Sequence, residues 1–274
     1  MSGVTQVRAE RYTHGHAESV LRAHAARTAK DCLAYGVGYL QPGMTVLDVG
    51  CGPGTITADI AQLVAPGRVL AVDLDAGVLE QAREHARTRG ITNIDFRVMD
   101  AYALACADDF VDFAHAHQVL HHMSDPVAVL REMKRVTRPG GRIAVRESVD
   151  LALTWYPDNE GISAWQRLFR ELIRANGGDP AAGRYLFSWA HKAGLTDVVA
   201  SSSSWTYSAG SSARWWGQLW ADRLLGSSIT DQLIGEGLAT MDELQAVAEG
   251  WLEWSEHPDA WFMVPCGEIL ATVD

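Results

Sequence analysis

The sequence predicts an α/β protein built on a doubly wound, largely parallel sheet. Short apolar runs that suit buried strands alternate with segments of helical periodicity through residues 45–150. The first run, residues 46–49, is followed by three glycines at alternate positions, Gly50, Gly52 and Gly54. Because glycine accepts positive φ and carries no Cβ, this spacing predicts a tight turn that a ligand can approach closely.

The elements of this core can be placed in order along the chain. Strands are expected at residues 46–49, 68–73, 94–98, 110–116 and 142–148, and helices at 55–64, 76–89 and 125–137. Since a helix connects most consecutive strands, the strands should run parallel. One or two further helices are expected at 17–39, behind a polar arm at 12–16. That arm is either an exposed terminus or a lid over a bound ligand.

The character of the chain changes after residue 150, where all ten tryptophans lie. Helices are expected at 160–176, 183–193, 211–225, 228–236 and 240–256, and strands at 196–206 and 260–265. No linker rich in glycine, serine or proline separates the two halves, so the second half should complete the same sheet. We therefore expect a single domain over residues 1–274, with an arm at 1–44, a ligand-binding core at 45–150 and helical insertions at 151–274.

Composition and charge limit the kinds of partner. The 274 residues carry a formal net charge of −11, of which −9 falls on residues 151–274 (16 Asp and Glu against 7 Lys and Arg). This balance argues against a nucleic-acid substrate, which needs a basic surface. No apolar run reaches the roughly 18 residues that a membrane span requires. The four cysteines lack metal or disulfide spacing and suit a reducing compartment, so we expect a cytoplasmic protein.

Two acidic residues follow the strands beside the glycine turn: Asp73 ends the second strand and Asp100 follows the third. The carboxyl ends of parallel strands share one edge, where open α/β sheets bind ligands, so a nucleoside is expected there. Asp73 could accept both ribose hydroxyls, and Asp100 an adenine amino group. A phosphate-binding loop would need a lysine after Gly54, and a dinucleotide loop would need glycine where Thr55 stands.

With these residues the chain resembles the class I S-adenosylmethionine (SAM)-dependent methyltransferases. The resemblance rests on residues 46–55, 71–73, 99–101 and 119–122, and on 138–141 before the fifth strand. The subgroup resembled contains ubiquinone and menaquinone biosynthesis enzymes and many natural-product methyltransferases. It implies a Rossmann-like, seven-stranded sheet of order 3-2-1-4-5-7-6 with strand seven antiparallel. It also implies SAM as the cofactor, with S-adenosylhomocysteine as its product.

The resemblance further implies which residues hold the cofactor. They come from the arm, the glycine turn and the ends of strands two to four: Tyr12, Asp48, Gly50, Cys51, Gly52, Gly54, Asp73, Leu74, Asp100, Ala101, His117 and Gln118. In this scheme the glycine turn contacts the methionine moiety, Asp73 holds the ribose, and Asp100 with Ala101 fixes the adenine edge. His117 and Gln118 would lie beside the methionine amine and the sulfonium.

Methyl transfer from a sulfonium requires an aligned nucleophile about 3 Å away. Where that nucleophile carries a proton, a general base helps, and histidine suits the role near neutral pH. His121, His122 and the arm residue His14 are the candidate bases, although each could instead cap a turn or pack in the fold. The histidine pairs at 14/16 and 115/117 lack a carboxylate cluster with ligand spacing, so no metal is expected.

The tryptophans favour a flat, apolar acceptor, because aromatic walls bind such molecules well. The candidate lining residues are Trp155, Trp165, Trp215, Trp216 and Trp220. We therefore predict transfer of a methyl group from SAM to a hydrophobic, aromatic or polycyclic small molecule, with the acceptor atom left open between carbon, nitrogen and oxygen.

Two alternatives remain at this point. One is a regulatory protein that binds SAM without turnover. The other is an NAD(P)-dependent oxidoreductase, which the misplaced third glycine disfavours. The N-terminal arm could also reach a neighbouring copy and form a homo-oligomer.

Overall fold

The structure, a computed structural model, describes residue 13 and residues 26–274. The arm residues Tyr12 and His14, and the start of the helix expected at 17–39, lie outside the described residues. The described part of that segment holds one short helix, α2 (Ala29–Cys32), and a 3-10 turn, η1 (Val37–Tyr39).

The first half of the chain alternates strands and helices, as the sequence predicts. Its elements are β1 (Thr45–Val49), α3 (Thr55–Val64), β2 (Arg68–Asp73), α4 (Ala76–Thr88), β3 (Ile94–Val98), β4 (Val111–His117), the 3-10 turn η2 (Leu120–His122), α5 (Pro126–Val136) and β5 (Thr137–Ser148). Asp75 and Asp125 cap α4 and α5 by accepting a backbone N–H of the first turn, a contact worth about 1 kcal/mol. The strand β5 begins earlier than predicted because residues 140 and 141 exchange backbone hydrogen bonds with Val273.

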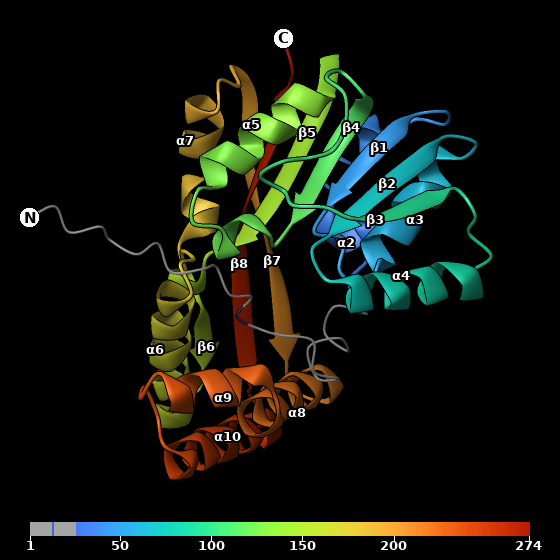
Figure 1. Ribbon diagram of the computed structural model, residues 1–274. Helices are drawn as coiled ribbons and strands as arrows, with labels where there is room; N and C mark the ends of the chain where they lie inside the picture. Colours follow the sequence, from blue (N-terminus) through green and yellow to red (C-terminus); the bar gives the residue numbers. More distant parts are fainter. Residues whose placement is uncertain (1–12, 14–25) are drawn as a thin grey trace, which may run out of the picture.

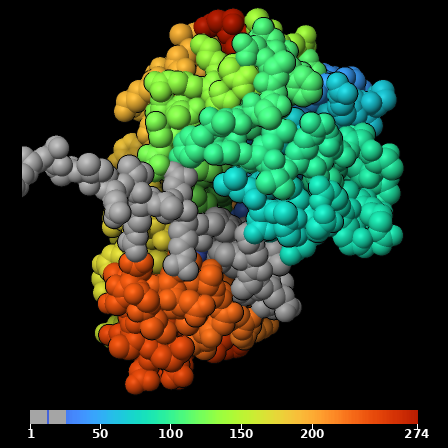
Figure 2. Space-filling model, viewed as in Figure 1, coloured from blue at the N-terminus to red at the C-terminus, as the bar shows by residue number. Residues whose placement is uncertain are grey.

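The second half adds two long strands and a layer of helices. Its elements are the 3-10 turn η3 (Asp150–Ala152), β6 (Thr154–Tyr156), α6 (Glu160–Ala175), α7 (Ala182–Lys192), β7 (Asp197–Ser208), α8 (Ser211–Gly226), α9 (Ser228–Gly235), α10 (Met241–Glu256) and β8 (Trp261–Thr272). Figure 1 shows α8, α9 and α10 gathered at the end of β7 and β8 that lies farthest from the C-terminus. In the space-filling view of Figure 2 this layer, in orange, projects below the α/β part of the molecule.

The sheet has the order β3-β2-β1-β4-β5-β8, with β7 pairing the far side of β8. Strands β1 to β5 pair in parallel, and β8 is antiparallel to both β5 and β7. The predicted order 3-2-1-4-5-7-6, with its seventh strand antiparallel, is therefore confirmed, with β7 and β8 as the sixth and seventh strands.

One strand was not predicted. The three residues of β6 pair with Trp261–Met263 of β8, on the side that β5 covers farther along the strand. Three residues are too few for a recognisable strand pattern in the sequence. The strand β6 forms because β8 extends beyond β5 and offers a free edge there. The strand β8 also runs to Thr272, well past the predicted end at residue 265.

Side chains of β1 alternate between the two faces of the sheet. Val46 packs with Ile60 of α3, whereas Leu47 packs with Leu130 of α5, and all of them are fully buried. Helices therefore cover both faces, as a doubly wound sheet requires. A third apolar cluster, built around Trp165, joins α6, α8 and α10 to β8. Among the described residues, no helix combines the length and apolar character needed to cross a membrane.

Candidate active site

The glycine turn after β1 has the backbone that its sequence predicts. Gly50, Gly52 and Gly54 have φ of 65°, 53° and 79°, a region that side chains disfavour. A Cβ on Gly50 would lie only 2.5 Å from Cγ2 of Val119. The turn is also tied to β2, because the Cys51 N–H donates to the Val72 carbonyl at 3.0 Å.

Asp73, at the end of β2, holds the same turn from the other side. Its Oδ2 accepts the Gly52 N–H at 3.0 Å and its Oδ1 accepts the Asp75 N–H at 3.1 Å. Each oxygen keeps a further lone pair, so the carboxylate can accept two more hydrogen bonds from a ligand. The neighbouring Leu74 is 64% exposed, although it has an apolar side chain.

Asp48 lies inside β1 and is almost fully buried. Its Oδ2 accepts from Oγ1 of Thr57 at 2.5 Å, and its Oδ1 lies 2.7 Å from Nδ1 of His115. Both oxygens are thus satisfied by neighbours in α3 and β4. Asp48 therefore fastens the start of α3 to the sheet beneath the glycine turn.

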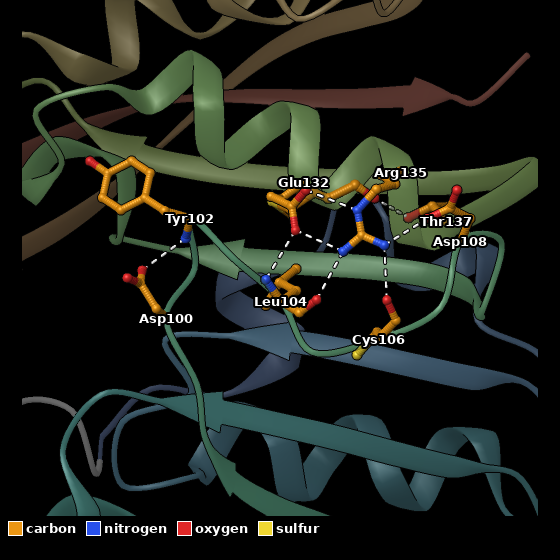
Figure 3. Close-up of polar contacts among 9 residues, drawn as sticks. Asp100, Tyr102, Leu104, Cys106, Asp108, Glu132, Arg135 and Thr137 are labelled. Atoms are coloured by element: carbon orange, nitrogen blue, oxygen red, sulfur yellow. Dashed lines mark hydrogen bonds and ion pairs between the residues drawn. The ribbon is translucent and has the colours of Figure 1, made fainter.

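The loop after β3 is fastened by Arg135 of α5 (Figure 3). Its guanidinium donates to the carbonyls of Leu104 and Cys106, at 2.9 and 2.8 Å, and pairs with Asp108 and Glu132, at 2.7 Å each. Glu132 in turn accepts the Leu104 N–H at 3.0 Å. The hydrogen bonds to the two carboxylates raise the pKa of Arg135. This network fastens the loop to the last turn of α5.

That loop carries two of the predicted cofactor residues. Oδ1 of Asp100 accepts the Tyr102 N–H at 2.9 Å, as Figure 3 shows, and Asp100 itself is exposed. Ala101 is buried. The turn thus places the Ala101 side chain toward the sheet and leaves the Asp100 carboxylate in solvent.

A cavity of about 360 Å³ opens at this edge of the sheet, which we call the larger cavity. It is lined by nine of the predicted cofactor residues: Asp48, Gly50, Cys51, Gly52, Asp73, Leu74, Ala101, His117 and Gln118. Gly54 and Asp100 are not among its lining residues. Gly54 instead precedes the first turn of α3, where a Cβ would lie 2.9 Å from that of Ala82.

The two candidate bases of η2 lie side by side between this cavity and the core. The rings of His121 and His122 have centroids 3.7 Å apart, and His122 lines the larger cavity. Nδ1 of His121 lies 2.6 Å from Oε2 of Glu147, which is fully buried at the end of β5. Burial lowers the pKa of both histidines, that of His121 to about 3, and raises the pKa of Glu147 to about 7.

A second, smaller cavity of about 60 Å³, the aromatic cavity, lies between β5, β8 and the helical layer. Its aromatic lining residues are Trp165, Phe169, Trp205, Trp216, Trp220 and Phe262. Of the predicted lining residues, Trp155 instead packs on the ring of Phe262 at 6.0 Å, and Trp215 lies at the surface, 36% exposed.

The two cavities share two lining residues, Arg27 and Gln118. Nη2 of Arg27 donates to Oε1 of Gln118 at 2.8 Å. Gln118 has φ of 55°, unusual for a residue other than glycine. The guanidinium of Arg27 lies 5.4 Å from the ring centre of Trp205, and that of Arg146 lies 4.2 Å from it, within the range of cation–π attraction.

Several site residues were missed by the sequence reasoning, chiefly Glu147, Arg27 and Trp205. For Glu147 a signal existed, because it ends the fifth strand and so must reach the same edge as Asp73. The described residues contain no group of three His, Cys, Asp or Glu side chains that could hold a metal ion.

Comparisons with known proteins agree with this geometry. Residues 40–194 match the model of a family described as "Methyltransferase domain". An uncharacterised methyltransferase of Schizosaccharomyces pombe is 33% identical over 94% of this chain and 95% of its own. The ubiquinone/menaquinone biosynthesis C-methyltransferase of Klebsiella pneumoniae is 38% identical over 39% of this chain and 44% of its own.

A solved structure shares the fold. It is a phosphoethanolamine N-methyltransferase of Haemonchus contortus, in complex with phosphomonomethylethanolamine and S-adenosylhomocysteine. It matches with a TM-score of 0.54 at 16% identity, over 88% of this chain and 51% of that one.

The chain belongs to this family of methyltransferases, and it is a class I SAM-dependent enzyme. The larger cavity fits SAM, because its volume lies in the range of small-molecule sites and its glycine turn leaves the backbone accessible. Because the matched family is one of methyltransferases, the oxidoreductase is not retained.

Proposed function

We propose that this methyltransferase acts on a hydrophobic, aromatic or polycyclic small molecule. The observation that carries the proposal is the aromatic cavity, which adjoins the larger cavity at Arg27 and Gln118. Rings such as Trp165 and Trp220, with centroids 4.4 Å apart and an angle of 64°, form one wall. Flat apolar molecules gain the most from packing against such walls.

The acceptor would displace Arg27 on binding. The aromatic cavity, at about 60 Å³, is smaller than the roughly 300 Å³ at which ligand sites begin. Breaking the hydrogen bond between Arg27 and Gln118 would join it to the larger cavity. An acceptor in the joined space would lie with one end among the tryptophans and the other beside His117. The buried walls would exclude water from the reaction.

When bound, SAM supplies a methyl group on a sulfonium that is already a good leaving group. We propose that Asp73 accepts the ribose hydroxyls with the lone pairs that Gly52 and Asp75 leave free. Leu74 and Ala101 would cover the adenine, and Asp100, with Tyr12 of the arm, would complete the site. The residues of the chain would then act by alignment, which can lower the barrier by roughly 7–11 kcal/mol.

The broader setting is also a proposal. The Klebsiella relative is named for quinone biosynthesis, which favours a quinone-like or secondary metabolite as acceptor here. The four free cysteines favour work in the cytoplasm. Exchange of the N-terminal arm between copies would give a homo-oligomer, which light scattering would detect as a mass above 29.9 kDa.

The direct test is turnover with SAM and a panel of acceptors. Purified protein is incubated with SAM and either aromatic or small hydrophilic acceptors, and released S-adenosylhomocysteine is measured by mass spectrometry. We expect release with aromatic acceptors alone. Release with only small hydrophilic acceptors would contradict the proposed acceptor class.

A further inference from the structure

The buried side chain of Glu147 accepts several hydrogen bonds from the segment that follows β4, beside the larger cavity. Its Oε1 accepts the N–H groups of Val119 and Leu120 at 2.9 and 2.8 Å, and its Oε2 accepts that of His121 at 3.4 Å. The same Oε2 lies 2.6 Å from Nδ1 of the His121 ring. The carboxyl group therefore fixes both the backbone that precedes the ring and the ring itself.

His121 is placed to meet the acceptor. His121 lines the aromatic cavity, while His122, whose ring is tilted by 44° to that of His121, lines the larger cavity. Because Nδ1 is engaged by Glu147, Nε2 is the nitrogen that remains for an acceptor. The imidazole therefore lies at the boundary between the two cavities, where the methyl group and the acceptor would meet.

We propose that His121 is the general base and Glu147 its positioning residue for an acceptor that loses a proton when it is methylated, such as a phenol. This inference rests on the proposed function. The acceptor hydroxyl oxygen bonds to the methyl carbon, and the electron pair of the C–S bond stays on sulfur. The hydroxyl proton passes to Nε2 of His121, which becomes an imidazolium beside the Glu147 carboxylate.

The ionisation of Glu147 decides which tautomer His121 adopts. The ionised carboxylate accepts a hydrogen bond from Nδ1–H, which leaves the Nε2 lone pair free to act as a base. A protonated Glu147 donates to Nδ1 instead, which puts the ring proton on Nε2 and blocks the base. Since burial raises the pKa of Glu147 to about 7, activity should rise with pH through about 7.

The charged and titratable groups around His121 and Glu147 favour ionisation of the pair in some cases and oppose it in others. These groups are Arg27, Tyr35, His122 of η2, Arg146 of β5, Asp150 of η3 and Cys266 of β8. Arg146 favours the ionised carboxylate, whereas burial opposes it. Burial lowers the pKa of His121 most, and Arg27 lowers it further. Displacement of Arg27 by an acceptor would remove the second of these two effects.

The E147Q variant tests the pair with little change of shape. A glutamine oxygen still accepts from Val119 and Leu120. Its amide group gives up the long hydrogen bond from the His121 N–H and donates to Nδ1, which holds His121 in the blocked tautomer. We expect kcat to fall 100-fold or more, the rise through pH 7 to disappear, and the affinity for S-adenosylhomocysteine to stay within about threefold. The H121N variant should lose kcat by a similar factor even if E147Q does not fold.

A readout without SAM separates this inference from the proposed function. In ¹⁵N-histidine-labelled protein, with the His121 signal assigned by its absence from H121N, we expect Nδ1–H in the wild type at pH 8 and Nε2–H in E147Q. An Nε2–H tautomer in the wild type at pH 8 would overturn the pair, whatever the enzyme methylates. A wild type with no turnover of any acceptor would overturn the proposed function instead. Loss of kcat in H122N but not in H121N would also overturn the assignment of the base.

Discussion

The larger cavity and the aromatic cavity differ in what builds their walls. The larger one is lined mainly by turns at the ends of β1, β2 and β4, whereas the aromatic one is lined by side chains from α6, α8, β7 and β8. Turn conformation depends on neighbouring residues, but the aromatic wall depends on distant ones, such as Trp165 and Phe262, whose rings lie 6.2 Å apart. The cofactor can thus be inferred from a motif, while the acceptor must be inferred from tertiary packing.

The largest expected effect is on cofactor affinity at the glycine turn, which lines the larger cavity but not the aromatic cavity. Gly50→Ala places a Cβ 2.5 Å from Val119 and a side chain at φ of 65°. We expect affinity for S-adenosylhomocysteine, measured by isothermal titration, to fall more than 100-fold, which is about 3 kcal/mol. The control is Gly140→Ala, which has φ of 77° but nothing within 4 Å of its Cβ. Equal affinity in the two variants would contradict the close approach at Gly50.

A smaller effect is expected at the carboxylate beside the turn. Asp73→Asn leaves one oxygen for two backbone donors, Gly52 and Asp75, and turns an N–H toward one of them. We expect a loss of about 2 kcal/mol in cofactor binding, or roughly 30-fold. Asp125→Asn is the control, because Asp125 also accepts a backbone N–H but lies outside both cavities. Titrations that give one affinity for both variants would exclude Asp73 as a cofactor ligand.

Two adjacent tryptophans of α8, Trp215 and Trp216, test whether the aromatic cavity binds the acceptor. Trp216 is 8% exposed and stacks on Tyr207 with centroids 4.1 Å apart, whereas Trp215 is 36% exposed. With a turned-over aromatic acceptor, Trp216→Phe should raise the acceptor KM about tenfold, the loss of about 1.4 kcal/mol of packing. Trp215→Phe should leave KM unchanged. Equal effects of the two substitutions on KM would remove the aromatic cavity as the acceptor site.

The smallest effect concerns a buried carboxyl group of the aromatic cavity. Burial raises the pKa of Asp150 to about 7. Between pH 4 and 7 the folded state therefore keeps a proton that the unfolded state has released, so this group's contribution to stability is present at low pH and lost as pH rises through 7. Asn cannot titrate, so Asp150→Asn does not lose stability in this way. Between pH 4.5 and 7.5 the free energy of unfolding of the wild type should fall, relative to that of the variant, by at least about 1 kcal/mol in urea titrations. Parallel pH profiles would contradict the raised pKa.

Much of the fold followed from local pattern. The strands of the parallel half and their helices lie within a few residues of prediction, because apolar runs, helical periodicity and capping residues such as Asp75 act locally. Asp73, Gly50 and Gly52 line the larger cavity because a parallel sheet brings the carboxyl ends of its strands to one edge.

The remainder could not be predicted, for a physical reason. Trp205 alternates with serines along β7 and carries no motif, and it reaches Arg27 and Arg146 only through the folded sheet. Trp215 and Trp216 are indistinguishable in sequence, yet helix packing buries one and exposes the other. The place of Glu147 near the end of the fifth strand could be predicted, but its contacts with the backbone and ring of η2 could not.

The central claim is that cofactor and acceptor occupy different cavities that meet at Arg27 and Gln118. Titration of S-adenosylhomocysteine into Asp73→Asn and Trp216→Phe, with no acceptor present, tests it most directly. We predict a roughly 30-fold weaker affinity in Asp73→Asn and an affinity within twofold of the wild type in Trp216→Phe. Weaker binding in Trp216→Phe with wild-type binding in Asp73→Asn would contradict the account.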